Sequence, residues 1–244
     1  MKPFLILQLR GNDLAAQDEF DAFLKYGNLS TDDVVRVRME ADDLPEVSID
    51  DYSGIIVGGG PWNVSDADEK KTDKQHEAEA WLSALLDRIM QADSPYLGAC
   101  YGFGMAATFR GATVSKERYG EGVEATTIHL RPEAQEDPLL QGIPEIFPAF
   151  AGHKESCQDL PEDAVWLASS EACPYHMFRW GQNVYATQFH PELDIPVIRN
   201  RIDIYKNAGY FPPEEAEPLK ELASKQEITV PMEILRRFVE KYRR

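Results

Sequence analysis

Residues 96–102 read Tyr-Leu-Gly-Ala-Cys-Tyr-Gly, a short apolar segment that leads into a cysteine between small residues and glycines. The apolar segment predicts a brief strand, and residues 103–109 continue with a helical pattern. A nucleophile held between glycines at a strand-to-helix turn is the nucleophile-elbow pattern, here with sulfur in place of oxygen. A thiol at a helix N-terminus is also expected to have a lowered pKa. The alternative is that Cys100 is a small buried apolar side chain, the commoner fate of a free cysteine.

The residues before this turn alternate between predicted strands and helices. Strands are predicted at residues 4–9, 34–39 and 55–57, and helices at residues 12–26 and along an apolar stripe over residues 81–90. Such alternation predicts an α/β fold with a mostly parallel central sheet and helices on both faces. In the first helix, the side chains expected to face the interior are Leu14, Phe20, Phe23 and Leu24.

The second half of the chain is richer in predicted strands, which lie at residues 123–130, 164–168, 175–180 and 183–189. These short strands are expected to form a small antiparallel annex. A helix follows over residues 195–205, and the last helix begins at Pro231, a favoured first helical position. Residues 1–195 are therefore assigned to one domain, and residues 196–244 to a helical extension packed on it.

The composition narrows the possible partners and the location of the protein. The 244 residues carry 25 Lys and Arg against 42 Asp and Glu, a net charge of −17, which disfavours nucleic acid and anionic membranes as partners. The chain contains no apolar run of the ~18–20 residues that a membrane span needs, and the apolar start is interpreted as a first strand rather than a signal peptide. Three cysteines form no even framework, so a reducing cytoplasm is expected. We expect no metal site, because neither Cys-x-x-Cys nor His-x-x-x-His spacing is present.

A nucleophilic thiolate, such as the one predicted at Cys100, usually works with a histidine. His190 ends the predicted strand at 183–189, and the carboxyl ends of parallel strands are where α/β proteins build their sites. Glu192, two residues on, is close enough to fix the tautomer of the imidazole. The alternative is a surface His-Pro turn with a solvated glutamate. The other histidines are expected to be solvated (His76) or structural (His129 and His176), with His153 in a loop.

A second glycine-rich turn, Gly58-Gly59-Gly60-Pro61, follows the strand at residues 55–57. Backbone N–H groups of such a turn can face a developing oxyanion. A dinucleotide-binding or P-loop turn is excluded, because the Gly-x-Gly-x-x-Gly spacing and a following Lys-Ser/Thr are both absent. An oxyanion hole or a plain turn remains.

Gly-Gly-Pro after a strand, Gly-x-Cys-x-Gly at 98–102 and Phe-His-Pro-Glu at 189–192 resemble the class I (triad) glutamine amidotransferases over about residues 1–195. Ala-Ser-Ser at 168–170 is similar to the stand-alone, GMP-synthase-like and γ-glutamyl peptidase-like branch of that family. The resemblance implies a flavodoxin-like fold and hydrolysis of a γ-glutamyl C–N bond through a thioester, without a cofactor. By the same resemblance Cys100 attacks the amide carbon, His190 held by Glu192 moves the proton, and the N–H groups of Gly60 and Tyr101 hold the oxyanion.

The resemblance also implies a substrate pocket that includes Gly59, Trp62, Gly104 and His153. Glu121-Gly122 and residues 153–155 are interpreted as further pocket walls. The family often has Gln at the position of Gly104, where it helps to bind glutamine. Glycine leaves room there, which either admits a larger γ-glutamyl substrate or weakens the hold on free glutamine.

Several functions stay open at this point. A glutamine-hydrolysing chain would pass ammonia to a separate synthetase, because the residues outside the core are too few to form one. A γ-glutamyl peptide or amine hydrolase would need no ammonia acceptor. A regulatory subunit would keep the fold without catalysis. A thiol redox sensor would use Cys100 with Cys157 or Cys173 as its partner.

Overall fold

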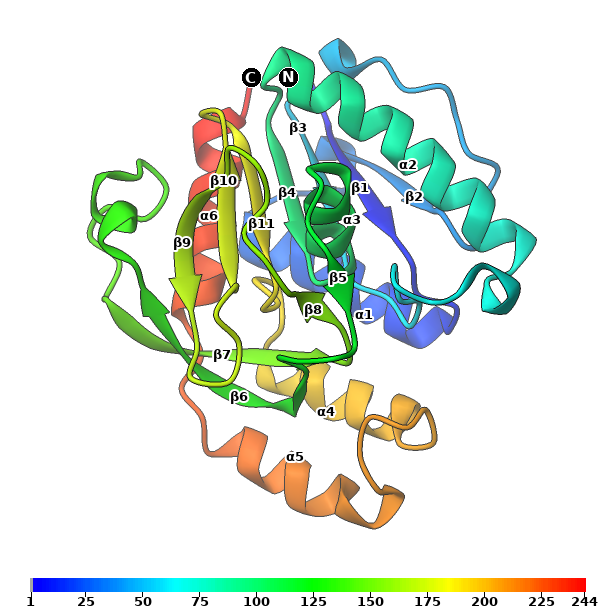
Figure 1. The fold of residues 1–244 in the computed structure, drawn as a ribbon, viewed down its shortest axis with the longest axis vertical. Helices are drawn as coiled ribbons and strands as arrows, with labels where there is room; N and C mark the ends of the chain where they lie inside the picture. The colour runs from blue at the N-terminus through cyan, green and yellow to red at the C-terminus, as the bar shows by residue number, and fades with distance from the viewer. Residues whose placement is uncertain (1) are drawn as a thin grey trace.

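A computed structural model describes residues 2–244, which form a nine-stranded sheet with helices on both faces (Figure 1). The strand order is β2-β1-β3-β4-β11-β10-β9-β6-β7. The strands of this sheet are β1 (Phe4–Gln8), β2 (Val34–Arg38), β3 (Gly54–Val57), β4 (Tyr96–Ala99), β6 (Glu121–Leu130), β7 (Ile146–His153), β9 (Val165–Ser169), β10 (Met177–Trp180) and β11 (Val184–Thr187).

The two halves of the sheet differ in strand direction. From β2 through β1, β3 and β4 to β11, every neighbouring pair is parallel. From β11 to β7, every pair is antiparallel. Two more strands, β5 (Val114–Ser115) and β8 (Ser156–Cys157), form a separate antiparallel pair. The predicted fold class is confirmed, and all four strands that were predicted for the annex belong to the central sheet itself.

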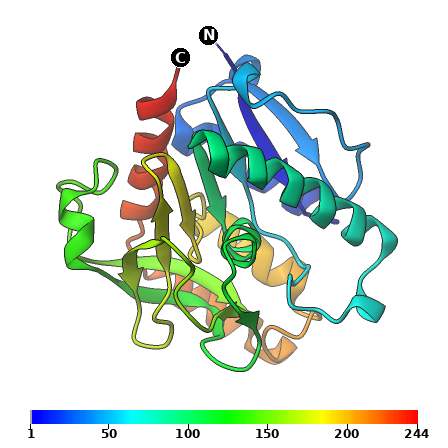
Figure 2. The same cartoon turned by 45° about the horizontal axis from the view of Figure 1, so that its top comes forward.

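Within residues 2–244, six α-helices lie around the sheet (Figures 1 and 2). They are α1 (Asp13–Gly27), α2 (Asp73–Ala92), α3 (Tyr101–Phe109), α4 (Ile195–Tyr205), α5 (Ala216–Ser224) and α6 (Val230–Tyr242). Successive side chains of a strand point to opposite faces, so Leu5 and Leu7 of β1 pack with α2 and α3, whereas Phe4 and Ile6 pack with α1 and α6. Helices α4 and α5 pack against Phe150 of β7 in a third apolar cluster.

The C-terminal helix contributes to the main core, since Ile234, Leu235 and Phe238 of α6 are fully buried with Phe4. The proposed boundary at residue 195 stays a prediction. No helix among residues 2–244 combines the length and the apolar character that a membrane crossing requires.

The structure corrects parts of the predicted secondary structure. Leu14 was predicted to face the interior, but it lies in the first turn of α1 and is 57% exposed. Strand β7 was not predicted, because Pro148 and Gly152 interrupt its pattern; an edge strand tolerates both residues. Helix α5 was also missed, and α2 begins at Asp73, well before the apolar stripe that predicted it.

Candidate active site

Cys100 lies in the turn between β4 and α3 with φ 52° and ψ −94°. Residues other than glycine rarely adopt this backbone conformation. Glycines make this turn possible. A Cβ added at Gly98 would lie 2.7 Å from the backbone of Gly102, and one at Gly102 would lie 2.8 Å from the Val57 carbonyl oxygen. The strained turn holds the thiol at the carboxyl edge of the parallel strands, as the nucleophile-elbow pattern predicts.

His190 follows β11, the parallel neighbour of β4. The Cys100 N–H donates to the Thr187 carbonyl at 2.8 Å, which fixes the two segments side by side. A Cβ added at Gly59 would lie 2.7 Å from His190 Cε1 and 3.3 Å from Cys100 Cβ, so both side chains pack against the same glycine. The spacing between the two side chains therefore depends on the absence of a side chain at residue 59.

Glu192 orients the imidazole of His190. Its Oε1 lies 2.9 Å from His190 Nδ1, and both side chains are buried. A carboxylate accepts, so Nδ1 carries the hydrogen and Nε2 of the neutral ring keeps its lone pair. That assignment leaves one ring nitrogen free to take a proton.

A buried ion network supports Glu192 from behind. Arg201 Nη2 donates to Glu192 Oε1 at 3.0 Å and to Glu19 Oε1 at 3.2 Å. Arg10 Nε donates to the same Glu19 oxygen at 3.0 Å, and Gln8 Nε2 donates to Glu19 Oε2 at 2.8 Å. Buried charges are stable only when paired in this way, so the network fixes the carboxylate that holds His190.

Burial sets the protonation of the site. It lowers the pKa of His190 below its ordinary value, with Glu192 opposing and Arg201 and Arg10 adding to the shift. Burial alone would raise the pKa of Glu192, but His190 and then Arg201 hold it well below the ordinary range. The site therefore contains a neutral imidazole beside an ionised carboxylate at neutral pH.

The pKa of the Cys100 thiol differs from the predicted one. Cys100 is at the start of α3, but burial raises its pKa to about 12, against the opposing charge of Arg10. The predicted lowering of the pKa by the helix terminus is therefore outweighed by desolvation. The resting pair is therefore a thiol beside a neutral imidazole.

Two cavities meet at Cys100 and share Gly60, Gly152 and Tyr210 in their walls. We call the first the apolar cavity; it is also lined by Arg10, Val123, Ala151, His190, Leu193, Ile198, Arg201, Tyr205 and Phe211. We call the second the polar cavity; it is also lined by Trp62, Asn63, Tyr101, Gly104, Val114, His153, Lys154, Glu155 and Gln188. The sulfur thus borders two spaces, and the wall of the first combines apolar side chains with Arg10 and Arg201.

The predicted substrate pocket is only partly reproduced. Trp62, Gly104 and His153 line the polar cavity, whereas Gly59 lies against His190 and Cys100 and lines neither cavity. A Cβ added at Gly104 would lie 3.3 Å from Val64 Cγ2, so even a methyl group there requires the Val64 side chain to shift slightly.

The proposed oxyanion donors border the sulfur. Gly60 and Tyr101 line the polar cavity with Cys100, and no acceptor for either N–H is found among residues 2–244. A Cβ added at Gly60 would lie 2.6 Å from the Leu9 carbonyl oxygen, so this position requires glycine. Both N–H groups are thus free to donate to a ligand.

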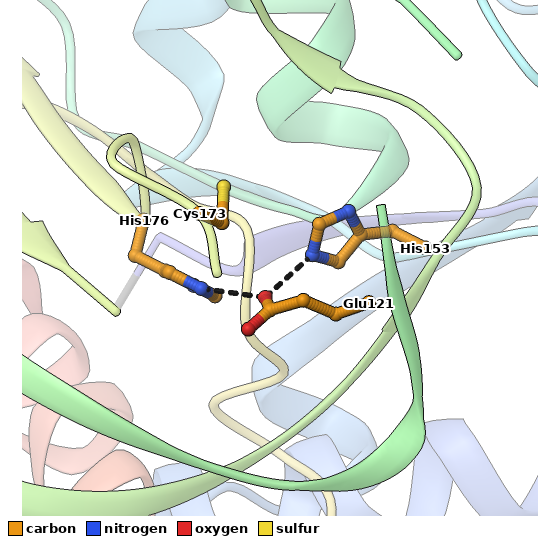
Figure 3. A group of neighbouring side chains, drawn as sticks. All are labelled: Glu121, His153, Cys173 and His176. Atoms are coloured by element: carbon orange, nitrogen blue, oxygen red, sulfur yellow. Dashed lines mark hydrogen bonds and ion pairs between the residues drawn. The ribbon is translucent and has the colours of Figure 1, made fainter. Parts of the chain in front are cut away.

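A second buried group lies behind the polar cavity (Figure 3). It consists of Glu121, His153, Cys173 and His176, and we call it the Glu121 cluster. His153 and His176 each place Nε2 within 2.9 Å of Glu121 Oε2. His153 therefore lines the polar cavity while its ring nitrogens are engaged elsewhere.

Comparison with known proteins agrees with this geometry. The family described as "Glutamine amidotransferase class-I" matches residues 25–201, which is most of the chain. The chain belongs to the class I glutamine amidotransferase family.

Relatives within the family differ in their named activities. The chain is 27% identical to a glutamine-hydrolyzing GMP synthase subunit of Archaeoglobus fulgidus over 178 residues, 70% of this chain and 86% of the relative. It is 26% identical to γ-glutamyl peptidase 3 of Arabidopsis thaliana over 185 residues, 72% of this chain and 68% of the relative. A glutamine amidotransferase structure from Thermotoga maritima has the same fold, with a TM-score of 0.79, 20% identity and coverage of 99% and 98% of the two chains.

Sequence reasoning missed part of the site of this amidotransferase. Arg10 directly follows β1, at the same carboxyl edge as Cys100, and that position could have indicated it. Glu19 and Arg201 lie inside helices and carry no such signal. Tyr205 and Tyr210 line the apolar cavity from the end of α4 and the segment after it, beyond the stretch that the motifs cover.

Proposed function

We propose that this amidotransferase is a cysteine-dependent hydrolase of a γ-glutamyl C–N bond. The observation that carries the proposal is the buried pair of His190 and Glu192 beside Cys100 at a strained elbow. A plain structural cysteine needs neither a backbone in the left-handed region nor a histidine with one nitrogen free. The glutamine-hydrolysing relatives in the family support the same reaction class.

The proposed reaction has two halves. Cys100 Sγ attacks the side-chain carbonyl carbon while His190 Nε2 takes the thiol proton, and the N–H groups of Gly60 and Tyr101 donate to the oxyanion. The C–N bond breaks, and His190 returns the proton to the departing nitrogen. Water then attacks the thioester with His190 as base, which breaks the C–S bond, releases glutamate and restores the thiol.

The two cavities suggest how a substrate divides across the sulfur. The polar cavity, with Asn63 and Gln188 in its wall, suits the glutamyl part. The apolar cavity, with Leu193, Ile198 and Phe211 as well as two arginines in its wall, suits a leaving group that is larger than ammonia and has both apolar and polar parts. This division favours a γ-glutamyl peptide or amine over free glutamine, and the likeness to a γ-glutamyl peptidase supports it.

A second candidate is the release of ammonia from glutamine to a separate synthetase. The likeness to a glutamine-hydrolyzing GMP synthase subunit favours it, since the chain spans 86% of that relative. In that case the apolar cavity would be the exit for ammonia rather than a leaving-group site. The two candidates share the chemistry at Cys100 and differ only in the substrate.

The test is glutamate release by the wild-type chain and by Cys100→Ala. The panel holds L-glutamine, glutathione, γ-glutamyl dipeptides with apolar second residues, and a γ-glutamyl alkylamine. We expect turnover of the peptides or the amine above that of glutamine, and none by the variant. Turnover of glutamine alone favours the ammonia-releasing candidate. No glutamate from any compound, with Cys100 still open to alkylation, contradicts the hydrolase proposal and favours a regulatory or redox role.

A further inference from the structure

The Glu121 cluster is assembled from three separate parts of the chain. Glu121 begins β6, His153 ends β7, and Cys173 and His176 lie between β9 and β10. One donor atom from each side chain lies within 4.8 Å of every other. The side chains are almost fully enclosed, with 5% of Glu121, 2% of His153 and none of His176 exposed. Neither the proposed reaction nor the apolar core explains why these groups are gathered here.

The hydrogen bonds of His153 call for a positive charge inside the cluster. Its Nδ1 lies 2.9 Å from the Glu155 carbonyl oxygen, and its Nε2 lies 2.9 Å from Glu121 Oε2. Both neighbours only accept hydrogen bonds, whereas a neutral imidazole has a single N–H to donate. With Nδ1 donating to the carbonyl, the Nε2 lone pair would face a carboxylate oxygen, so Nε2 must carry a second proton or bind a metal ion.

The contact between His153 Nδ1 and the Glu155 carbonyl is of the kind that orients histidine ligands in metal sites. A ligating histidine typically donates its other ring N–H to a carbonyl or a carboxylate. Glu121 is held in a comparable way, because its Oε1 accepts from Thr126 Oγ1 and Ser170 Oγ at 2.9 Å each while Oε2 faces the two rings. The outer contacts of a metal site are therefore present around two of the four side chains.

His176 and Cys173 are the other two potential ligands in the Glu121 cluster. Among residues 2–244, Nδ1 of the buried His176 has no hydrogen-bond partner, so the polar contacts of its ring are made at Nε2, which lies 2.7 Å from Glu121 Oε2 and 3.1 Å from Ser170 Oγ. Cys173 Sγ lies 3.1 Å from Ser156 Oγ and is fully buried. The hydrogen-bonding contacts of the His176 ring are thus all made on the side that faces Glu121.

We propose that the Glu121 cluster binds one Zn²⁺ ion through Nε2 of His153 and His176, the Glu121 carboxylate and Cys173 Sγ. Zinc takes four nitrogen, oxygen and sulfur ligands at about 2.0–2.3 Å in a tetrahedron, which separates ligand atoms by about 3.3–3.7 Å. The separations here, from 2.7 Å up to 4.8 Å, span that range. Side-chain movements of about 1 Å therefore suffice to close the site.

The charges of this ligand set balance. Two neutral imidazoles, one carboxylate and one thiolate contribute −2, which Zn²⁺ neutralises in a buried place. On binding, four bonds to the metal form, and the proton of the Cys173 thiol and any proton on His153 Nε2 pass to water. All four positions are taken by protein, so the site is closed and structural rather than catalytic. The ion would join the β6–β7 hairpin to the β9–β10 connection behind the polar cavity.

The first test is the metal content of the purified full chain after dialysis against metal-free buffer. We expect about one zinc per chain by plasma mass spectrometry. A chain stripped with chelator and loaded with Co²⁺ should show the strong visible bands of a tetrahedral site and a thiolate-to-metal charge-transfer band. A chain that contains no zinc and takes up neither Zn²⁺ nor Co²⁺ at equimolar metal overturns the proposal.

Matched variants locate the ion. Cys173→Ala and His176→Gln should each lose stoichiometric zinc, and Cys173→Ala should lose the charge-transfer band. Cys157→Ala, which removes the other fully buried thiol, should keep both. Circular dichroism checks that each variant folds, and the Co²⁺ spectrum of the wild-type chain needs no variant. Zinc that persists in both the Cys173 and His176 variants places the metal elsewhere and contradicts the proposal.

Discussion

The chain buries cysteine, histidine and glutamate together in two places, and the two differ in which atoms are left free. At Cys100, one histidine contacts one carboxylate through Nδ1, and the sulfur borders two cavities. In the Glu121 cluster, two histidines converge on one carboxylate oxygen, and the sulfur of Cys173 is fully enclosed. The same residue types thus form one open arrangement and one closed arrangement.

The backbone explains much of this difference. Cys100 is held in the left-handed region at the carboxyl edge of the parallel strands, where a side chain projects into a cavity. Cys173 lies in the β9–β10 connection and is fully buried, with its sulfur against Ser156 of β8. Reactivity therefore requires strain and access as well as the right residues, and the closed cluster is suited to holding structure.

The largest expected effect is the contrast between the two cysteines. Cys100→Ala should lower glutamate release by about 10⁴-fold or more, because it removes the attacking atom. Cys173→Ala should lower it less than about 10-fold, and Cys157→Ala should be near neutral. Steady-state assays of equally folded variants measure the contrast. A dead Cys173 variant with an active Cys100 variant would reverse the assignment of the two sites.

The next effect concerns the partners of the thiol. His190→Ala removes the proton carrier, whereas Glu192→Gln keeps the shape of the orienting side chain and loses its charge. We expect the turnover number of His190→Ala to fall roughly 10-fold to 100-fold further than that of Glu192→Gln. A slower Glu192 variant would argue against the roles given to the two side chains. The control is His129→Gln, which alters an exposed histidine that lines neither cavity.

A smaller effect is expected at Gly104, on the polar side of the sulfur. Gly104→Gln should shift the ratio of kcat/KM for glutamine to that for a γ-glutamyl dipeptide by about 10-fold towards glutamine, since it fills space and adds an amide. Gly104→Ala is the matched control, because its methyl group only approaches Val64. An alanine variant with the full shift would mean that volume, rather than the amide, sets the preference.

The smallest expected effect is on pH dependence. Activity needs neutral His190, and its pKa is lowered from the ordinary 6.5, first by burial, so the acid limb of kcat/KM should lie below pH 6.5. Arg201→Gln removes a positive charge that lowers this pKa, so the limb should move to higher pH. Arg199→Gln, on the same helix, should leave it in place. A limb that moves down in the Arg201 variant would contradict this account of the site.

The parts of the fold and of the candidate site that could be predicted from the sequence are those that depend on short motifs. The elbow at 98–102 and the pair of His190 and Glu192 each lie within five residues, and both follow parallel strands whose carboxyl ends meet at one edge. Local patterns were therefore enough to predict the central sheet and three side chains of the candidate site. Their catalytic roles remain predictions.

The rest depends on contacts between distant segments. Arg201 donates a hydrogen bond to Glu19 only because α4 packs near α1, and no local sequence pattern predicts that contact. The Glu121 cluster needs the β6–β7 hairpin, and β7 itself was missed because Pro148 interrupts its pattern. Only Cys173 and His176 are neighbours in sequence, and two ligands do not predict a site. The raised pKa of Cys100 likewise follows from burial that only the fold creates.

The most direct test of the central claim is to trap the covalent intermediate. The wild-type chain would be mixed with a substrate that it turns over, quenched in acid within the first turnover and analysed by peptide mass spectrometry. The account predicts a glutamyl thioester on the peptide that contains Cys100, and none on those with Cys157 or Cys173. Glutamate release by Cys100→Ala at the wild-type rate, or an adduct on Cys173 instead, would contradict it.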